Sequence, residues 1–600
     1  VNIKRSPLCG RNFEYLSEDP YLAGELGVGI VDGIQSKGVG TSLKHFAVNN
    51  QETDRLRVSA AVSQRALREI YLPAFEKVVT TSQPWTVMCS YNKINGTYAS
   101  ENSWLLQDVL RTQWGFQGLV VSDWGAVYDK VASIKGGTDL EMPPVLPYSP
   151  DAVVAAVKDG TLDDAVLDER VRAVLELVAK GSQVLGLEET YDADAHHDLA
   201  RRVAGECGVL LANDGLLPIA PSTKVAVIGE FARTPRYQGA GSSQVNPTRV
   251  VAPLDALSDV YETTFAPAYS LDTYEADAAL VAEAVAAAEA AEAVVMVIGL
   301  PGPEESEGFD RTHINLPANQ LAALAAVAAA NPKVAVVLVN GSTVALGDVT
   351  PHAAALLEVW LGGQAGGAAI ADLVSGAVNP SGRLAETIPH RLEDNPSYLT
   401  FPGEHQKVLY GEDVFVGYRG YDARSLDVAF PFGYGLSYTS FELSGLQVAT
   451  TGSVADGTLA ATVTVTVTNT GERDGSHVVQ VYVSDPVASV ARPPRELKGF
   501  SKVHLAAGAS TAVTIVLDQR AFSYWSEPLD RWVVEAGDFV VAVGDHSRDL
   551  PLTQTLTVEA PSVGAPLTMW STYQEWLADD GGRALLDEAA AAGQPDLRNY

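Results

Sequence analysis

The chain has 600 residues, 46% of them hydrophobic and 19% charged, with a formal net charge of −33 at pH 7. That length exceeds what one hydrophobic core organises and predicts roughly three or four domains. The negative charge disfavours binding to nucleic acid or anionic lipid, and no apolar run approaches the ~20 residues of a membrane-spanning helix. The three cysteines lie far apart without metal-ligand spacing, so we expect neither a disulfide framework nor a metal site.

Residues 1–180 alternate strand-like runs that end in polar residues with helical stretches. This order is typical of a parallel α/β domain, and polar strand ends suit the catalytic face of a (β/α)8 barrel. About five strand-like runs are visible where a barrel needs eight. We therefore expect the C-terminal part of a catalytic barrel whose N-terminal part is missing from these residues. The runs are Thr41–His45, Thr86–Tyr91, Leu119–Trp124 and 137–142, and the helices are Ser63–Thr80 and Ser103–Trp114, with Ser63 and Asn102-Ser103 as N-caps.

A linker over 181–199 and a second α/β domain over 200–395, an α/β sandwich, are predicted next. The Ala-rich stretch Ala276–Ala291 has strong helix propensity and should cover the sheet of this domain. Its expected strands are Lys224–Gly229, Ala293–Gly299, Val334–Asn340 and Ala355–Trp360.

The remaining residues predict a connection, an all-β domain and a tail. Residues 396–435 form an irregular, aromatic-rich connecting segment. In the region 436–560, Thr462–Val467 alternates strictly between polar and apolar residues, which is typical of a half-buried strand in a β-sandwich. The tail, 561–600, should contain a helix around Thr572–Ala592.

One strand-like run ends abruptly at an acid beside an aromatic residue, in the stretch GLVVSDWGA. Asp123 would face the mouth of the barrel, next to Trp124. A carboxylate beside a flat indole suits a sugar site, because the acid attacks or stabilises an oxocarbenium-like carbon while the ring packs on the sugar. On the residues alone, Asp123 could equally cap the following helix.

Donor side chains follow two other strand ends. Lys44, His45 and Arg55 could hold sugar hydroxyls, bind a phosphate or pair with nearby carboxylates. Tyr91 could donate a hydrogen bond to the acid, or belong to the core with a polar tip.

A series of stretches, in order along the chain, resembles glycoside hydrolase family 3 in its β-glucosidase branch. The resemblance runs from residue 1 to about residue 560 and implies a barrel, an α/β sandwich and a fibronectin type III-like β-sandwich. Members of this branch usually have a further sugar-binding aspartate, at a position that would lie before Val1. The stretches are GRNFEYLSEDP, LKHFAVNNQETDR, MCSYNKINGTYASEN, WGFQGLVVSDWGA, SEGFDR, YGEDVFVGYRGYD and FPFGYGLSYTSFEL.

The resemblance also implies residue roles. Asp123 matches the nucleophile of the family, and Glu307, in SEGFDR, matches the acid/base. Chemistry alone leaves Glu304, Glu305 and Asp310 as rivals of Glu307. Ser243, in the stretch GAGSS, is a weaker candidate contact. The residues that match the sugar-binding positions are Arg11, Lys44, His45, Arg55, Tyr91 and Trp124.

These residues imply a retaining, exo-acting β-glucosidase that needs no metal or organic cofactor. The expected partner is a small β-glucoside or oligosaccharide, and a homo-oligomer is compatible with the sequence. The alternatives are a β-xylosidase or dual-specificity glycosidase and, from another class, a catalytically impaired carbohydrate-binding fragment. If barrel units are missing, we expect these 600 residues expressed alone to be inactive or prone to aggregation.

Overall fold

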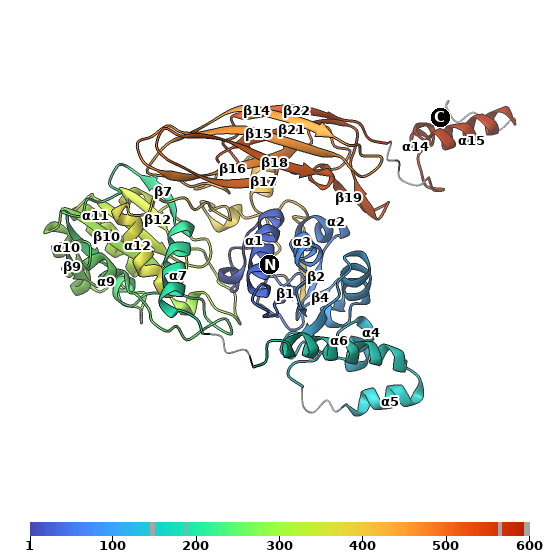
Figure 1. Ribbon diagram of the computed structural model, residues 1–600, viewed down its shortest axis with the longest axis horizontal. Helices are drawn as coiled ribbons and strands as arrows, with labels where there is room; N and C mark the ends of the chain where they lie inside the picture. The colour runs from blue at the N-terminus through green and yellow to red at the C-terminus, as the bar shows by residue number, and fades with distance from the viewer. Residues whose placement is uncertain (145–149, 187–189, 562–563, 565–566, 593–600) are drawn as a thin grey trace.

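The computed structural model describes residues 1–144, 150–186, 190–561, 564 and 567–592. Figure 1 shows three lobes: the first domain, a second α/β domain beside it, and a β-sandwich across both. Helices α14 (Tyr573–Ala578) and α15 (Asp580–Ala591) project beyond the sandwich, so the helix predicted in the tail is split in two. Residues 562–563, 565–566 and 593–600 of the predicted tail lie outside the described residues, as do 187–189 of the predicted linker.

The first domain contains a parallel sheet of three strands in the order β1-β3-β6: Ser42–Phe46, Thr86–Cys89 and Leu119–Ser122. The run predicted at 137–142 is not a strand. Left-handed Gly137 ends helix α4 (Lys130–Gly136), and a single bridge then joins Leu140 to Val121. The described residues therefore form a parallel α/β layer without closing an eight-stranded barrel.

Helices cover this sheet and begin close to where the sequence predicts. Helix α1 (Pro20–Gln35) is capped by Asp19. The Ser63 hydroxyl accepts the Ala66 N–H at 2.9 Å, and Asn102 Oδ1 accepts the Leu105 N–H at 3.1 Å. The first predicted helix is interrupted by a π-helical turn and the second is π-helical throughout, a detail that periodicity does not reveal. Their segments are α2 Gln64–Ala66, a π turn at Leu67–Tyr71, α3 Pro73–Ser82 and a π helix at Trp104–Gln113.

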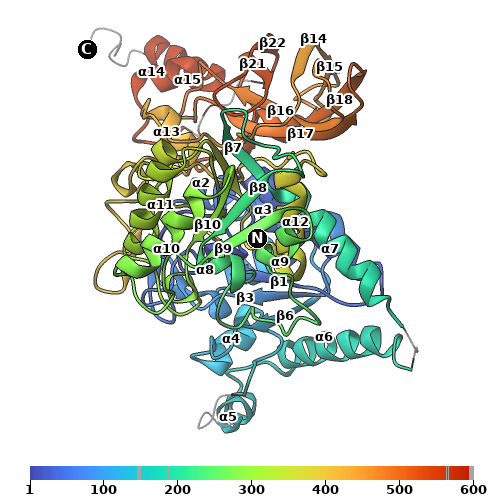
Figure 2. The same ribbon diagram turned by 90° about the vertical axis from the view of Figure 1, so that its left-hand side faces the viewer.

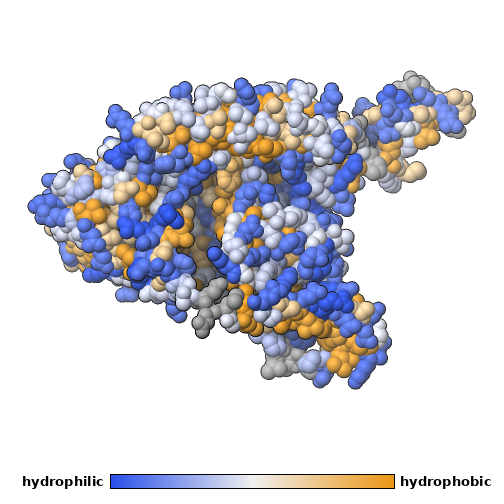
Figure 3. Space-filling model, in the orientation of Figure 1, coloured by the Kyte–Doolittle hydropathy of each residue, from blue (hydrophilic) through white to orange (hydrophobic). Residues whose placement is uncertain are grey.

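Helices α5 (Asp151–Asp159) and α6 (Asp164–Ser182) lie at the lower end of the first domain (Figure 2). On α6, Val171, Leu175 and Val178 recur at helical spacing and are exposed. Figure 3 shows the apolar surface that results. The described residues leave this face of α6 uncovered, and none of their helices is long and apolar enough to cross a membrane.

The second domain is built on a six-stranded sheet in the order β7-β12-β11-β10-β8-β9, parallel except for β7. Helices pack on it, so β10 and β11 are buried at every residue, as parallel strands covered on both faces are. All four predicted strands are present. The bounds are β7 Val209–Asn213, β8 Lys224–Ile228, β9 Glu262–Ala266, β10 Ala293–Gly299, β11 Val334–Val339 and β12 Ala355–Glu358, with helices α7 Ala193–Cys207, α8 Glu230–Arg233, α9 Pro253–Ser258, α10 Ala278–Glu289, α11 Ala318–Ala330 and α12 Gly366–Ser375.

The third lobe is a sandwich of two antiparallel sheets, one of three strands and one of four. Strand β15 contains the predicted run Thr462–Val467, and its residues alternate between buried and half-buried. The three-stranded sheet has β14 Phe441–Thr451, β15 Ala460–Asn469 and β18 Ser510–Asp518; the other has β16 Gly475–Ser484, β17 Glu496–Leu505, β21 Gly537–Gly544 and β22 Leu552–Val558. A small hairpin pairs β19 Tyr524–Ser526 with β20 Arg531–Val533.

The segment between the second domain and the sandwich returns to the first domain. Its strand β13 (Lys407–Leu409) pairs in parallel with β2 (Ser59–Ala61), which also pairs with β4 (Lys93–Ile94) and, through it, β5 (Thr97–Tyr98). Arg5, whose side chain is fully buried, pairs with Glu412 just after β13. A short helix, α13 (Tyr418–Ala423), follows. The segment predicted as irregular is therefore part of the first domain's structure.

Candidate active site

Strand β6 brings Asp123 to the carboxyl edge of the parallel sheet. The Asp123 N–H donates to the Cys89 carbonyl at 3.2 Å, which continues the pairing of β3 with β6. Asp123 is buried; its Oδ1 accepts the Trp124 N–H at 2.7 Å, whereas its Oδ2 has no hydrogen-bond partner among the described residues. Burial raises the pKa of Asp123, and the Trp124 N–H and the nearby Tyr91 hydroxyl oppose that rise. Of the two carboxylate oxygens, Oδ2 is thus the one that no backbone N–H occupies.

His45, at the end of β1, lies beside this oxygen. Its Nε2 is 3.7 Å from Asp123 Oδ2. Burial and the charge of Arg11 hold the pKa of His45 well below its ordinary value, so the ring is neutral at pH 7. Asn2 fixes the backbone here: its side chain donates to the His45 carbonyl at 2.8 Å and accepts the His45 N–H at 2.7 Å. The ring is thus held in place with Nδ1 unpartnered among the described residues.

Lys44 and Trp124 lie at the open side of the site. The Lys44 Nζ is 3.7 Å from Glu14 Oε2, and its side chain is 36% exposed. Trp124 is 52% exposed, which leaves its ring open to solvent. Both side chains are therefore accessible to a molecule that enters from this side.

Tyr91 and Arg55 form another wall. The Arg55 guanidinium lies 5.0 Å from the centre of the Tyr91 ring. Burial, with the negative charges of Asp123 and Glu307, raises the pKa of the Tyr91 hydroxyl, so it stays protonated and can donate a hydrogen bond. Arg55 Nη1 donates to Glu307 Oε1 at 3.0 Å and to Glu52 Oε2 at 2.7 Å.

Glu307 comes from the second domain, in the loop 303–311 after β10. Its Oε2 accepts the Ser242 N–H at 2.8 Å. Its Oε1 faces two arginines of the first domain: Arg55, and Arg11 with Nη1 at 3.6 Å. The site is therefore assembled from two domains, and the predicted residues Arg11, Arg55 and Glu307 lie together.

The surroundings of Glu307 keep it ionised. Burial disfavours its charged form, but hydrogen bonds from Ser242 and Arg55 and the charge of Arg11 outweigh burial and lower the pKa of Glu307 to about 2. At pH 7 the carboxylate of the free protein holds no proton to donate. A role as general acid requires that bound substrate weaken these contacts and raise the pKa toward neutrality.

The three rival acids of this loop have other contacts. Glu305 is buried, and its two oxygens accept the Gly341 N–H at 3.1 and 2.9 Å. Asp310 accepts N–H groups of the first domain, described below. Glu304 faces Tyr274. Of the four acids, Glu307 is the one whose carboxylate contacts Arg11 and Arg55.

Ser243, the weaker candidate contact, lies in the loop 239–243, and its contact with a sugar stays a prediction. The loop 239–243 does approach Glu307, because a Cβ on Gly241 would meet the Glu307 side chain at 2.5 Å. The contact with Glu307 is made by the backbone N–H of Ser242, and both Ser242 and Ser243 are exposed. The tight turn at Gly241 therefore places the Ser242 N–H against Glu307.

The sequence interpretation missed the acids that hold the arginines. Glu14 pairs with Arg11, and Glu52 pairs with Arg55, in both cases three residues along the chain. The signal for both was present, since GRNFEY and ETDR each contain an acid and an arginine at that spacing. Among the described residues, no group of three or more His, Cys, Asp or Glu side chains could hold a metal ion.

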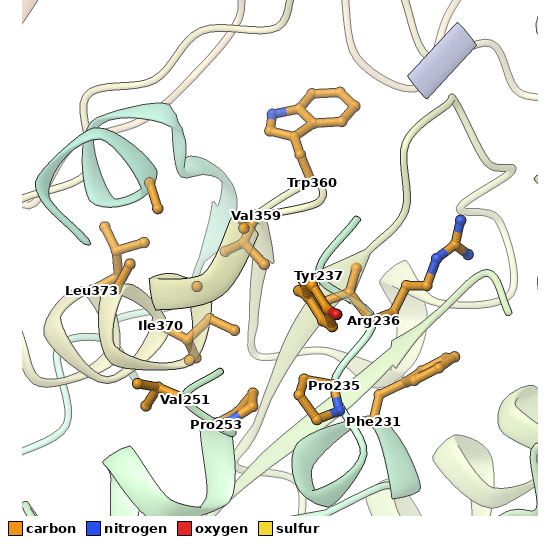
Figure 4. A pocket seen from close by; sticks show the side chains of 17 residues that line it. Phe231, Pro235, Arg236, Tyr237, Val251, Pro253, Val359, Trp360, Ile370 and Leu373 are labelled. Atoms are coloured by element: carbon orange, nitrogen blue, oxygen red, sulfur yellow. The ribbon is translucent and has the colours of Figure 1, made fainter. Parts of the chain in front are cut away.

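A separate pocket lies at the sheet edge of the second domain (Figure 4). Its volume of about 20 Å³ admits one water molecule but no sugar. This pocket is therefore not a candidate sugar site, and the cluster around Asp123 and Glu307 remains the candidate active site. The labelled lining residues of the small pocket are Phe231, Pro235, Arg236, Tyr237, Val251, Pro253, Val359, Trp360, Ile370 and Leu373.

Comparisons with known proteins identify the family. Residues 1–177 match the glycosyl hydrolase family 3 N terminal domain, 208–438 the glycosyl hydrolase family 3 C-terminal domain, and 477–547 a fibronectin type III-like domain. An exo-alpha-(1->6)-L-arabinopyranosidase of Bifidobacterium longum is 52% identical over 606 residues, covering 99% of this chain and 79% of the relative. The chain belongs to glycoside hydrolase family 3.

As a family 3 member the protein is a glycoside hydrolase, which confirms the predicted resemblance. Thermostable beta-glucosidase B of Acetivibrio thermocellus is 45% identical, covering 100% of this chain and 80% of the relative. The crystal structure of a GH3 beta-glucosidase of Bifidobacterium adolescentis matches with a TM-score of 0.93 and 53% identity, over 98% of this chain and 86% of that one. A beta-glucosidase of Kluyveromyces marxianus in complex with glucose matches with a TM-score of 0.87 and 30% identity, over 93% of this chain and 87% of that one.

Proposed function

We propose that the protein is a retaining, exo-acting β-glucosidase with Asp123 as nucleophile and Glu307 as acid/base. The observation that carries this proposal is the pairing of two unlike carboxylates around one set of donors. Asp123 Oδ2 accepts no backbone N–H, Glu307 is held by Arg11 and Arg55, and the charges of both carboxylates raise the pKa of Tyr91. Two carboxylates in different environments are what double displacement at a glycosidic carbon requires.

The proposed reaction proceeds in two steps. An Asp123 oxygen bonds to the anomeric carbon while the glycosidic bond breaks, and Glu307 gives a proton to the leaving oxygen. Water then attacks the glycosyl-enzyme; Glu307 takes one of its protons, and the Asp123 carboxylate is released. Neutral His45 and cationic Lys44 lie where they can hold sugar hydroxyls, and exposed Trp124 offers a ring to the sugar face.

A second candidate sugar is an α-L-arabinopyranoside, favoured by the 52% identity to the Bifidobacterium longum relative. In its chair form this sugar has an equatorial glycosidic bond, as a β-D-glucoside does, so the same two carboxylates could cleave it. It lacks the C5 hydroxymethyl group and has an axial C4 hydroxyl. A β-xyloside also lacks that hydroxymethyl group. One such group contributes about 1–3 kcal/mol of discrimination in an apolar pocket.

The test is the stereochemistry of the first product. Proton NMR of an aryl β-glucoside digest should show β-glucose before α-glucose. Release of α-glucose first would exclude double displacement. Glu307→Gln should lose far more kcat/KM on alkyl than on dinitrophenyl glucosides, because the latter need little proton assistance.

Sugar preference is tested by comparing kcat/KM on 4-nitrophenyl β-glucoside, β-xyloside and α-L-arabinopyranoside. We expect the glucoside to be the best substrate. A higher value for the arabinopyranoside would assign the second candidate. Saturable glucose binding without turnover of any of the three would instead support the carbohydrate-binding alternative.

A further inference from the structure

Glu52 is a buried acid that contacts the Glu307 loop. Its side chain is 0% exposed. Its Oε2 accepts the Gly308 N–H at 2.7 Å and Arg55 Nη1 at 2.7 Å, whereas its Oε1 is unpartnered among the described residues. Glu52 therefore holds the residue that follows Glu307 and one of the cations that contact it.

A single nitrogen of Arg55 joins two carboxylates. Nη1 contacts Glu52 at 2.7 Å and Glu307 at 3.0 Å. Arg11 also faces two carboxylates, through two nitrogens: its Nε pairs with Glu14, and its Nη1 lies 3.6 Å from Glu307. Each cation that faces Glu307 thus has a second carboxylate partner.

This sharing matters because a general acid must be neutral before it acts. When Glu307 takes up a proton, it ceases to neutralise Arg55. A partly buried guanidinium left without a counter-charge is costly, and that cost would oppose protonation of Glu307. Glu52 keeps Arg55 paired while Glu307 is neutral, and its bond to Gly308 keeps the loop in place.

We propose that Glu52 is a positioning residue that retains Arg55 and the Gly308 backbone so that Glu307 can hold the proton it donates. This inference rests on the proposed acid role of Glu307. Glu52 itself makes no bond and moves no proton. The proton passes from Glu307 to the glycosidic oxygen as Asp123 bonds to the anomeric carbon, and ionised Glu307 then pairs with Arg55 again.

The surroundings of Glu52 set the conditions of the test. Burial raises the pKa of Glu52 to about 7, while Arg55, the Gly308 N–H and Arg11 oppose that rise. Assays on the alkaline side of neutrality therefore keep Glu52 ionised. The charged and titratable groups that face it are Cys9, Arg11, Tyr15, Arg55 and Asp310.

The experiment measures kcat/KM of Glu52→Gln on two aryl glycosides of the preferred sugar. Phenol is a poor leaving group that needs a proton, whereas 2,4-dinitrophenol leaves without one. We expect the phenyl substrate to lose about 10–100-fold and the dinitrophenyl substrate less than about 3-fold. The matched control is Glu412→Gln, which also removes a buried carboxylate from an arginine, Arg5, outside the Glu307 loop. This control should change both substrates by the same factor.

Measuring Glu307→Gln on the same two substrates separates the acid role of Glu307 from the positioning role of Glu52. If Glu307→Gln shows no dependence on the leaving group, the acid assignment itself fails. If Glu307→Gln shows that dependence and Glu52→Gln slows both substrates equally, the role given to Glu52 is wrong. Should Glu52→Gln not fold, Glu52→Asp decides the matter, because it keeps the charge but shortens the reach to Gly308. A selective loss on the phenyl substrate supports the proposal, and an equal loss on both overturns it.

Discussion

Replacing Asp310 by alanine removes the acceptor that ties the Glu307 loop to the first domain. Asp310 Oδ1 accepts the N–H groups of Gly10 at 3.1 Å and Glu52 at 2.8 Å. Its Oδ2 accepts the N–H of Thr53 at 2.8 Å and the Thr53 hydroxyl at 2.7 Å. Thr53 is exposed, so water can replace its two contacts, whereas Gly10 and Glu52 are buried and cannot recover theirs.

The expected magnitude follows from those two buried donors. A hydrogen bond to a charged group contributes about 1.5–3 kcal/mol, so the free energy of opening the loop should fall by about 3–6 kcal/mol. Amide hydrogen exchange that reports this opening should accelerate by about 10²–10⁴-fold, since about 1.4 kcal/mol corresponds to a factor of ten. Asp310→Asn retains one acceptor oxygen and should give an intermediate acceleration.

Hydrogen exchange followed by mass spectrometry, on peptides covering 7–14, 49–56 and 302–311, measures this effect. The control is Asp474→Ala, which removes the acceptor of the Ala507 N–H, at 3.0 Å, in the β-sandwich. It should leave exchange in these three peptides unchanged. An acceleration of less than about tenfold in Asp310→Ala would mean that other contacts hold the loop, and would refute the reasoning.

Three further changes probe the site. Asp123→Asn should lower kcat by more than about 10³-fold while glucose still binds in calorimetry, and near-normal turnover would remove Asp123 from its role. Gly308→Ala should destabilise the protein by about 1–2 kcal/mol in thermal unfolding, because Gly308 has φ +104°, whereas Gly302→Ala, in open space without such a φ, should not. The pKa of His45 lies below 6.5 in the folded state, so as pH falls the unfolded protein takes up this proton first. The free energy of unfolding of wild type should therefore fall relative to that of His45→Gln as pH drops below 6.5. Parallel plots of unfolding free energy against pH for the two proteins would contradict this.

The strand-end half of the site could be predicted from the sequence. Apolar runs that stop at His45 and Asp123 mark the carboxyl ends of β1 and β6, and parallel strands bring those ends to one edge. The family resemblance extended this prediction to Arg11, Arg55 and Glu307, which the structure places together. It could not indicate which backbone groups fix Glu307, because the Ser242 contact depends on a turn 65 residues away.

Other features were hidden for physical reasons. Strand β9 lies at the sheet edge with two of its five residues exposed and two half-buried, so its apolar pattern is weak. The single bridge at Leu140 looks like a strand in sequence but follows a helix ended by left-handed Gly137. The Glu52 N–H donates to Asp310, 258 residues further along the chain, and no local sequence pattern indicates a contact of that range.

The return of β13 to the first domain has a consequence for biosynthesis. The ion-pair partner of Arg5, Glu412, is synthesised 407 residues after it. Strand β2 likewise remains without its neighbour β13 for nearly as long. At about 5–20 residues per second, that interval is roughly 20–80 s. A nascent first domain therefore carries an unneutralised guanidinium and an unpaired strand edge throughout the synthesis of the second. The Arg5–Glu412 ion pair and the β2–β13 pairing therefore form late, at a time that depends on the speed of translation.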